Sequence, residues 1–308
     1  SDPVNLAKLD QIRAGISELA DPRKTSAARA TTIAAQSPSI ALFQYSVHGD
    51  EPAGFEAAMQ VAYQLAASEE PQTLEILKSL VIVLNPSANP DGHERFAAWY
   101  NSVAVGADHP WAFEQSEPWS VTGRYSHFRF DMNRDLMAQS QPEVRAMMDG
   151  ILRWNPQVFV DHHSTTPTFF FPPVAQAVNM NLPAQTTKWF DTYGRGNAAA
   201  FDKYGWQYFV RGIFDFFYVG YWDEWTTFQG ATGMTYETDG GPEFRKRAGR
   251  GPAGTLLETP GRLRLDGSAG GLYGRTHGQS GDQVELTRLV LELNRLDEGE
   301  LDGFFEDR

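Results

Sequence analysis

The hydrophobic positions of this chain switch repeatedly between strand-like and helical spacing. Short, β-branched apolar runs predict buried strands over residues 39–47, 80–84 and 157–161. Apolar side chains three to four positions apart predict helices over residues 5–20, 52–67, 141–153 and 284–296. Strands that alternate with helices predict an α/β fold, with a mixed, largely parallel central sheet flanked by helices. The sequence shows no internal repeat and no domain boundary, so we expect one catalytic domain over residues 1–308.

The remaining stretches have weaker patterns. A polar segment follows the first helix over residues 21–37, and Asn-Pro-Asp-Gly at 89–92 is a strong turn signal. Hydrophobic residues over 101–128 follow neither helical nor strand spacing, which predicts a long packed loop. Aromatic clusters over 164–240 predict core, whereas residues 240–281 are rich in Gly, Arg and Pro. The basic run Arg245-Lys246-Arg247 is interpreted as part of a solvated loop, although it could attract an acidic substrate.

Composition narrows the class of protein. With 26 basic and 39 acidic residues the formal charge is -13, which disfavours nucleic acid and anionic membranes as partners. No apolar run reaches the ~20 residues of a membrane span. The chain has no Cys, so His and carboxylates are the only strong metal ligands available. The compartment stays open; a secreted or periplasmic location is the favoured hypothesis, although no signal peptide is present.

The first motif with chemistry is His48-Gly-Asp-Glu51, on the loop between a predicted strand and a predicted helix. A His and a carboxylate three residues apart at a strand end can turn onto one metal ion, and zinc accepts both ligand types. The alternative is that Asp50 and Glu51 cap the helix beside an incidental His.

The second motif, Asp161-His162-His163-Ser164, follows a buried strand. Adjacent histidines beside an acidic residue are costly to bury without a purpose. One imidazole could bind metal while Asp161 orients it through a hydrogen bond, because such carboxylates fix the tautomer of ligating histidines. The alternative is a satisfied His pair near the surface.

Two further segments offer polar groups. In Asp131-Met-Asn-Arg-Asp135, the side chains of Asn133 and Arg134 suit a carboxylate ligand, although Arg134 could instead pair with the neighbouring aspartates. In the segment 233–239, apolar neighbours could raise the pKa of Glu237 toward that of a general base.

In this chain order the motifs resemble the zinc metallocarboxypeptidase family, which includes carboxypeptidases A and B. The likeness spans residues 48–239. It also includes the Asn89–Gly92 turn and the stretch Tyr221-Trp-Asp-Glu-Trp225.

The resemblance implies a set of roles for individual residues. His48, Glu51 and His163 would hold one zinc ion, with His163 chosen over His162 because it precedes Ser164. Glu237 would be the general base for a zinc-activated water that hydrolyses a C-terminal peptide bond. Asn133 and Arg134 would hold the terminal carboxylate of the substrate.

The chain departs from the family pattern at several places. The family Arg that stabilises the oxyanion has no clear match beyond the Asn89–Gly92 turn, so we expect Arg95 or Asn101 to replace it. Tyr218 lies in the region of the mobile family Tyr. Trp222 should fill much of the side-chain pocket, which predicts a small or flat substrate side chain. Only 47 residues precede His48, so early strands of the family sheet could be absent.

Two other functions stay open at this point. One is a zinc-dependent deacylase or amidohydrolase that acts on acylated amino acids or cell-wall peptides, because related members of the fold share the ligand set. The other is an inert zinc-binding module, which the presence of Glu237 disfavours. The expected partner is therefore a peptide or acyl-amino-acid substrate; the oligomeric state is unknown.

Overall fold

The computed structural model describes residues 1–104, 117–166 and 168–239, and the statements below concern these residues. The predicted helix over 284–296 and the basic run at 245–247 lie outside the described residues. The elements in chain order are α1 (Pro3–Ala7), α2 (Leu9–Leu19), α3 (Ala27–Gln36), β1 (Ser39–Tyr45), α4 (Ala53–Ala67), α5 (Pro71–Ser79), β2 (Leu80–Asn85), α6 (Pro90–Val103), the 3-10 turn η2 (Trp119–Val121), α7 (Pro142–Trp154), β3 (Val158–Thr166), β4 (Phe169–Phe170), α8 (Ala184–Tyr204), β5 (Tyr208–Phe209), α9 (Trp222–Phe228) and β6 (Thr232–Asp239).

A six-stranded sheet forms the centre of the fold, with strand order β2-β1-β3-β6-β4-β5. The four strands β2, β1, β3 and β6 are parallel neighbours. β4 runs antiparallel to β6 and parallel to β5. The prediction of a mixed, largely parallel sheet is confirmed. Because parallel strands end at the same edge, the carboxyl ends of β1, β3 and β6 lie close together there.

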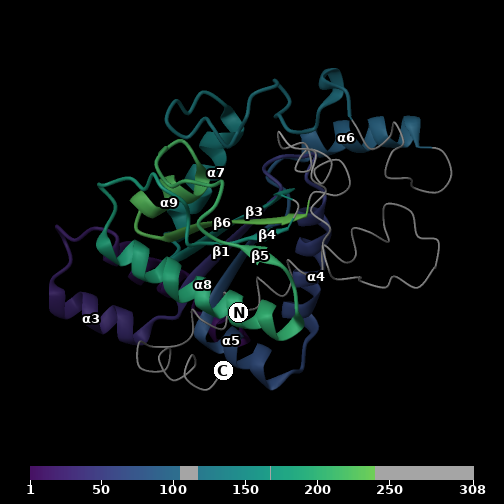
Figure 1. The fold of residues 1–308 in the computed structure, drawn as a ribbon. Coiled ribbons are helices and arrows are strands. Elements are labelled where there is room, and N and C mark those ends of the chain that lie inside the picture. Colours follow the sequence, from purple (N-terminus) through teal and green to yellow (C-terminus); the bar gives the residue numbers. More distant parts are fainter. Residues whose placement is uncertain (105–116, 167, 240–308) are drawn as a thin grey trace.

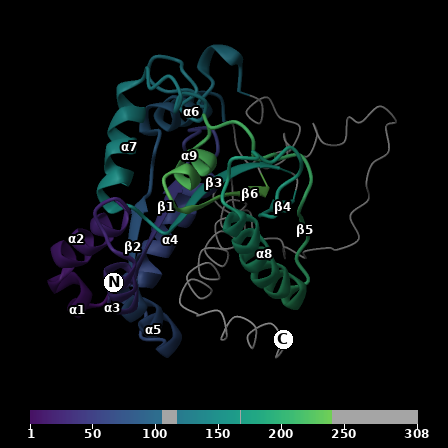
Figure 2. The same cartoon turned by 90° about the vertical axis from the view of Figure 1, so that its left-hand side faces the viewer.

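Helices cover both faces of this sheet (Figures 1 and 2). On one face α4, α5 and α8 pack over alternate side chains of β1, namely Ala41, Phe43 and Tyr45. On the other face α2, α7 and α9 cover the intervening positions, such as Ile40 and Leu42. The period of two in each strand therefore sends neighbouring residues into two different cores. Burying both faces explains why the strands read as continuous apolar runs.

The predicted strands and several helices are confirmed, with shifts at their ends. The strands correspond to β1, β2 and β3, and two of the helices to α4 and α7. The helix predicted over 5–20 is split at Lys8 into α1 and α2. β3 continues to Thr166, so both adjacent histidines lie inside the strand rather than after it.

The helices α3, α5 and α8 lie where the sequence pattern predicted none. α3 falls in the polar segment and has Ser26 as its N-cap, whose hydroxyl accepts from the Arg29 N–H at 3.3 Å. α5 begins with Pro71 at its first position. α8 is 21 residues long and contributes Phe190, Tyr193 and Phe201 to the core from within the aromatic-rich region. α3 is supported by its cap and α8 by tertiary packing, more than by a regular apolar stripe.

The Asn89–Gly92 segment is the beginning of α6 rather than an isolated turn. The Asn89 side chain accepts a hydrogen bond from the Gly92 N–H at 2.9 Å, and Pro90 occupies the first helical position. Both residues suit a helix start, because capping oxygens satisfy otherwise free N–H groups and Pro lacks one. The loop predicted over 101–128 begins with the end of α6 and includes η2.

Three loops meet backbone to backbone beside the edge where the parallel strands end. The N–H of Gly49 donates to the carbonyl of Gly123 at 3.0 Å. A Cβ added to Gly49 would lie 2.2 Å from the His93 nitrogen and 2.3 Å from the Gly92 carbonyl carbon. Gly therefore permits the loop after β1, the start of α6 and the segment before Arg124 to touch.

The helices of the described residues are too short or too polar to cross a membrane. None of them combines the length and the apolar character that a bilayer span requires.

We expect Gly49→Ala to lower the free energy of unfolding by about 1–3 kcal/mol, because the added methyl group must push apart two backbone segments. Gly150→Ala is the matched control: Gly150 lies in α7 and a Cβ there meets nothing within 4 Å. Urea denaturation measures both variants. Gly150→Ala should be at least as stable as the parent, because Ala favours a helix interior over Gly. A Gly49→Ala variant as stable as the parent would show that the loops can part without cost.

Candidate metal centre

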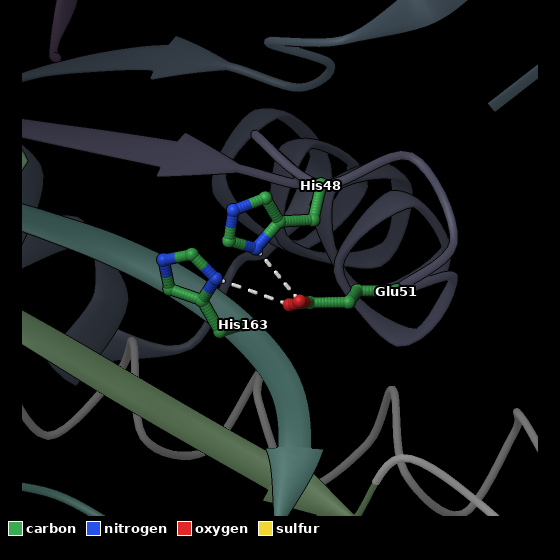
Figure 3. Close-up of side chains that lie close together, drawn as sticks. All are labelled: His48, Glu51 and His163. Atoms are coloured by element: carbon green, nitrogen blue, oxygen red, sulfur yellow. Dashed lines mark hydrogen bonds and ion pairs between the residues drawn. The ribbon is translucent and has the colours of Figure 1, made fainter. Parts of the chain in front are cut away.

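Three side chains converge at the carboxyl edge of the sheet (Figure 3). His48 and Glu51 lie on the loop between β1 and α4, and His163 lies near the end of β3. β1 and β3 are parallel neighbours, which places these segments side by side. All three side chains are buried, with 1–3% of each residue exposed. Two adjacent strands thus deliver residues 112 positions apart to one place.

The Glu51 carboxylate lies between the two imidazoles, and each oxygen faces one ring. Oε1 is 2.7 Å from Nδ1 of His48, and Oε2 is 3.0 Å from Nδ1 of His163. One ligand atom from each residue falls within a group no more than 4.8 Å across. Two imidazole nitrogens and a carboxylate oxygen form a donor set typical of zinc. The three residues could therefore bind one zinc ion.

The outer nitrogen of each imidazole is held by a second carboxylate. Nε2 of His48 lies 3.1 Å from Asp131 Oδ1, and Nε2 of His163 lies 2.8 Å from Asp161 Oδ2. A proton on Nε2 leaves Nδ1 with its lone pair directed at the centre of the cluster. Carboxylates that hold ligating histidines in this way are common around zinc. This pattern supports the fit of the residues to zinc.

Asp161 is itself held by the neighbouring strand. Gln44 of β1 pairs in register with Asp161 of β3, and its Nε2 donates to Asp161 Oδ1 at 3.2 Å. On the next strand, the side chain of Asn85 donates to Gln44 Oε1 at 3.4 Å. A row of polar side chains thus crosses the sheet to reach the outer nitrogen of His163.

The two adjacent histidines face opposite sides of the sheet. His163 lies on the side of Glu51, whereas the His162 ring stacks on Tyr45 with centroids 4.2 Å apart, in the core below α4 and α8. Nδ1 of His162 lies 3.1 Å from the Gln44 carbonyl oxygen. The geometry therefore matches the choice of His163 over His162, for a reason that strand alternation explains.

Burial and charge oppose each other in the pKa values of this cluster. Burial alone would lower the pKa of His163, but the carboxylates of Asp161 and Glu51 outweigh it and raise that pKa well above its ordinary value. Burial would likewise raise the pKa of Glu51, yet the two imidazoles hold it well below. His162 lacks such compensation, and burial lowers its pKa to about 4. The cluster therefore favours a protonated His163 beside an ionised Glu51. A metal ion that binds here would have to displace protons from the imidazoles.

Glu237 lies on the strand next to His163 and on the same side of the sheet. The two residues are register partners of β6 and β3. Oε2 of Glu237 accepts two hydrogen bonds from Thr165, from its backbone N–H and its hydroxyl, both at 2.8 Å. Burial raises the pKa of Glu237 to about 7 despite the charge of His163. A carboxylate with this pKa can accept and release a proton near neutral pH.

Arg124 is the cation that reaches the cluster, and no sequence motif pointed to it. Its guanidinium donates to Asp131 Oδ2 at 2.9 Å and lies 3.7 Å from Glu51 Oε1. The sequence signal is faint, because Arg124 lies in the stretch 101–128, where the sequence shows no motif. Gly123 contacts the His48–Glu51 loop, and this contact brings the arginine in.

Arg95 and Asn101, the residues expected to stabilise the oxyanion, lie on α6. The Arg95 guanidinium donates to three backbone carbonyls, those of Thr122, Tyr125 and Ser126, at 2.9–3.1 Å. Arg95 thus supports the segment that carries Arg124. Asn101 is exposed near the end of the helix.

The predicted substrate residues cluster around Asn133 and Arg134. Asn133 is buried with Nδ2 3.4 Å from Nε2 of His163, and Arg134 is exposed. The Tyr218 hydroxyl donates to the Arg134 carbonyl at 3.2 Å. The Trp222 ring, by contrast, is fully buried in the core between the sheet and α7, so the expectation that it fills an open substrate pocket needs correction. Only its backbone N–H reaches the site, where it donates to Asn133 Oδ1 at 3.1 Å.

A cavity of about 260 Å³ opens beside Glu51. Polar groups and two aromatic rings line it. The lining residues are Asp50, Glu51, Glu117, Trp119, Thr122, Arg124, Tyr125 and Thr165. The cavity gives a ligand access to the edge of the metal centre.

Two imidazoles and a carboxylate, buried together at the edge of a mixed sheet, form a candidate zinc site. The chain belongs to the zinc carboxypeptidase family, whose model matches residues 26–243. This match includes every residue of the cluster and Glu237. None of the curated proteins matches the sequence at a significant level.

Several solved structures share the fold. A metallo-carboxypeptidase from Burkholderia cenocepacia superposes with a TM-score of 0.54 at 15% identity, over 83% of this chain and 57% of that one. A metallo-carboxypeptidase from Pseudomonas aeruginosa, in complex with (2-guanidinoethylmercapto)succinic acid, has a TM-score of 0.55 at 14% identity. The match covers 84% of this chain and 59% of that one. Thrombin activatable fibrinolysis inhibitor has a TM-score of 0.54 at 12% identity, over 84% of this chain and 66% of that one. The chain thus spans 57% to 66% of the length of these proteins.

We expect Asp161→Asn to weaken zinc binding by about 10–100-fold, because an amide holds the His163 imidazole less firmly and lowers its basicity. Competition with a chelator measures the dissociation constant. Asp149→Asn, on the exposed face of α7, serves as the control and should bind zinc like the parent protein. An unchanged zinc affinity in Asp161→Asn would exclude Asp161 from this role.

Proposed function

We propose that the chain acts as a zinc-dependent carboxypeptidase, which hydrolyses the C-terminal bond of a peptide substrate. The observation that carries the proposal is the cluster of His48, Glu51 and His163 with Glu237 one strand away on the same side of the sheet. Three protein ligands is the number that catalytic zinc sites use, and such sites keep a further position for water or substrate. Zinc, when bound, would supply the Lewis acid that activates water and polarises the scissile carbonyl.

Glu237 acts as the general base in this proposal. Its carboxylate accepts the proton of the attacking water and passes it to the leaving amine. Thr165 holds Oε2 with two hydrogen bonds, which leaves Oε1 for the proton transfer. The pKa of about 7 suits both halves of that transfer, because the group is then neither too weak a base nor too weak an acid. A nearby cation would lower this pKa toward its ordinary value.

Arg124 takes the oxyanion role that was expected of Arg95 or Asn101. Its guanidinium is the cation beside the ligand residues, and it lines the cavity next to Glu51. A positioned cation stabilises the negative charge that develops on the carbonyl oxygen during attack. The Arg95 guanidinium instead donates to backbone carbonyls of the segment 122–126, and it thereby supports the backbone that carries Arg124.

Arg134 binds the terminal carboxylate of the substrate. The side chain is exposed and follows directly after Asn133, which lies against His163. A guanidinium can bind a carboxylate through two parallel hydrogen bonds. Recognition of a free carboxylate here would place the last peptide bond near the metal centre and would select a carboxypeptidase substrate over an amide.

We expect Glu237→Gln to retain zinc and to lose at least ~10²–10⁴-fold in kcat/KM, because the amide cannot accept the proton. In the parent enzyme, kcat/KM should fall as the pH drops through the pKa of Glu237, since protonation removes the base. Zinc analysis and kinetics on N-blocked peptides measure both effects. A Glu237→Gln variant with full activity would refute this mechanism.

We expect Arg124→Gln to lower kcat/KM by about 10²–10³-fold, the loss typical of one removed oxyanion donor. Zinc content must be measured in the same sample, because Arg124 also contacts Asp131. Arg153→Gln, on the exposed side of α7, is the control for loss of a surface charge. If zinc is retained and kcat/KM is unchanged, the oxyanion role of Arg124 is wrong.

A further inference from the structure

The guanidinium of Arg134 lies over the face of an aromatic ring. Its central carbon is 4.4 Å from the centroid of the Tyr221 ring. Tyr221 directly precedes α9, whereas Arg134 belongs to the turn that begins at Asp131, whose carbonyl accepts from the Arg134 N–H at 3.1 Å. A cation over a ring face is attracted by the negative charge of the π system.

This contact orients the guanidinium without using its hydrogen-bond donors. Within the described residues, the only hydrogen bond of the Arg134 side chain runs from NH1 to the Asn133 carbonyl, at 2.7 Å. A carboxylate partner would occupy two donors and cancel the charge. The ring of Tyr221 instead covers one face and leaves the edge of the guanidinium charged and available to an anion.

The segment 218–222 fixes the arginine from the backbone side as well. The Tyr218 hydroxyl donates to the Arg134 carbonyl at 3.2 Å, and the Tyr218 and Tyr221 rings meet edge to face with centroids 5.1 Å apart. The Trp222 N–H donates to Asn133 Oδ1 at 3.1 Å. The turn with Asn133 and Arg134 and the start of α9 thus form one contact region, in which Tyr221 touches the functional end of the arginine.

From this geometry we infer that Tyr221 is a positioning residue for carboxylate recognition, which holds the Arg134 guanidinium with its edge toward the C-terminus of the substrate. The inference rests on the proposed role of Arg134. It assigns to the start of α9 a function in discriminating a free carboxylate from an amide. Tyr221 itself touches neither the reacting atoms nor the metal ligands.

The experiment measures equilibrium binding in the zinc-loaded Glu237→Gln protein, in which hydrolysis is blocked. The probes are one N-blocked peptide with a free C-terminal carboxylate and the same peptide as its C-terminal amide, titrated by calorimetry. The variants are Tyr221→Leu, Tyr221→Phe and Arg134→Gln, with Tyr221→Gln as the substitute if the Leu variant does not fold. Tyr204→Leu is the matched control, because Lys203 lies over the exposed Tyr204 ring at 5.6 Å, at the end of α8.

Tyr221→Leu should weaken binding of the free-carboxylate peptide about two- to fivefold, the factor that an exposed cation–π contact supports. Binding of the amide should not change, because the amide does not use the guanidinium. Tyr221→Phe keeps the ring and should bind both peptides like the parent, as should Tyr204→Leu. Arg134→Gln should lose the preference for the carboxylate.

The outcomes separate this inference from the proposed function. If Arg134→Gln loses the preference and Tyr221→Leu keeps it, Tyr221 has no positioning role while the proposed function stands. Tyr221 likewise has no positioning role if Tyr221→Leu weakens binding of both peptides equally, which indicates general structural damage. If Arg134→Gln keeps the preference, carboxylate recognition by Arg134 is wrong and the inference is overturned with it. If the parent enzyme hydrolyses neither peptide but binding discriminates as expected, the catalytic proposal fails and the role of Tyr221 holds.

Discussion

The buried carboxylate of Glu51 is the constraint on which the rest of the centre depends. A carboxylate that is 1% exposed is tolerated only if its oxygens have strong partners. Here Oε1 faces His48, and Oε2 faces both His163 and the Ser164 N–H at 2.8 Å. These partners come from two neighbouring strands, so satisfying one charge requires the ends of β1 and β3 to stay in register. Asp131 and Asp161 then bind the outer nitrogens of the imidazoles and extend the same network to the surrounding elements.

Much of the sheet could be predicted from local sequence patterns, and the ligand set from those patterns together with the family resemblance. Apolar runs with turn signals behind them marked β1, β2 and β3 correctly. The local patterns offered His48 and Glu51 after one strand and a His pair on a neighbouring strand, and the family resemblance singled out the three residues that meet. The choice between His162 and His163 came from the family resemblance, and the alternation of β3 supplies its physical explanation: one ring enters the core beside Tyr45 and the other faces Glu51.

The remaining features depend on contacts that are distant in sequence. Nothing near Arg124 predicts that it reaches Glu51, since the glycine contact between loops brings it there. Gln44 looks like an interruption in an apolar strand until its register with Asp161 is known. Trp222 follows the aromatic pattern of a pocket residue, yet its ring completes the core. Helices α3 and α8 were missed because a capping serine and aromatic tertiary contacts, respectively, stabilise them more than a regular apolar stripe does.

The contact of Gly49, Gly92 and Gly123 has a consequence for how this family of sites can diverge. Arg124 is positioned by an anchor to the metal-binding loop and not by a fixed number of residues after the start of α6. Insertions or deletions between Gly92 and Gly123 would therefore preserve the position of the cation as long as the anchor glycines remain. Alignment by spacing alone would lose this arginine, whereas a search for a Gly-Arg pair that can dock on the His-Gly-Asp-Glu loop would retain it.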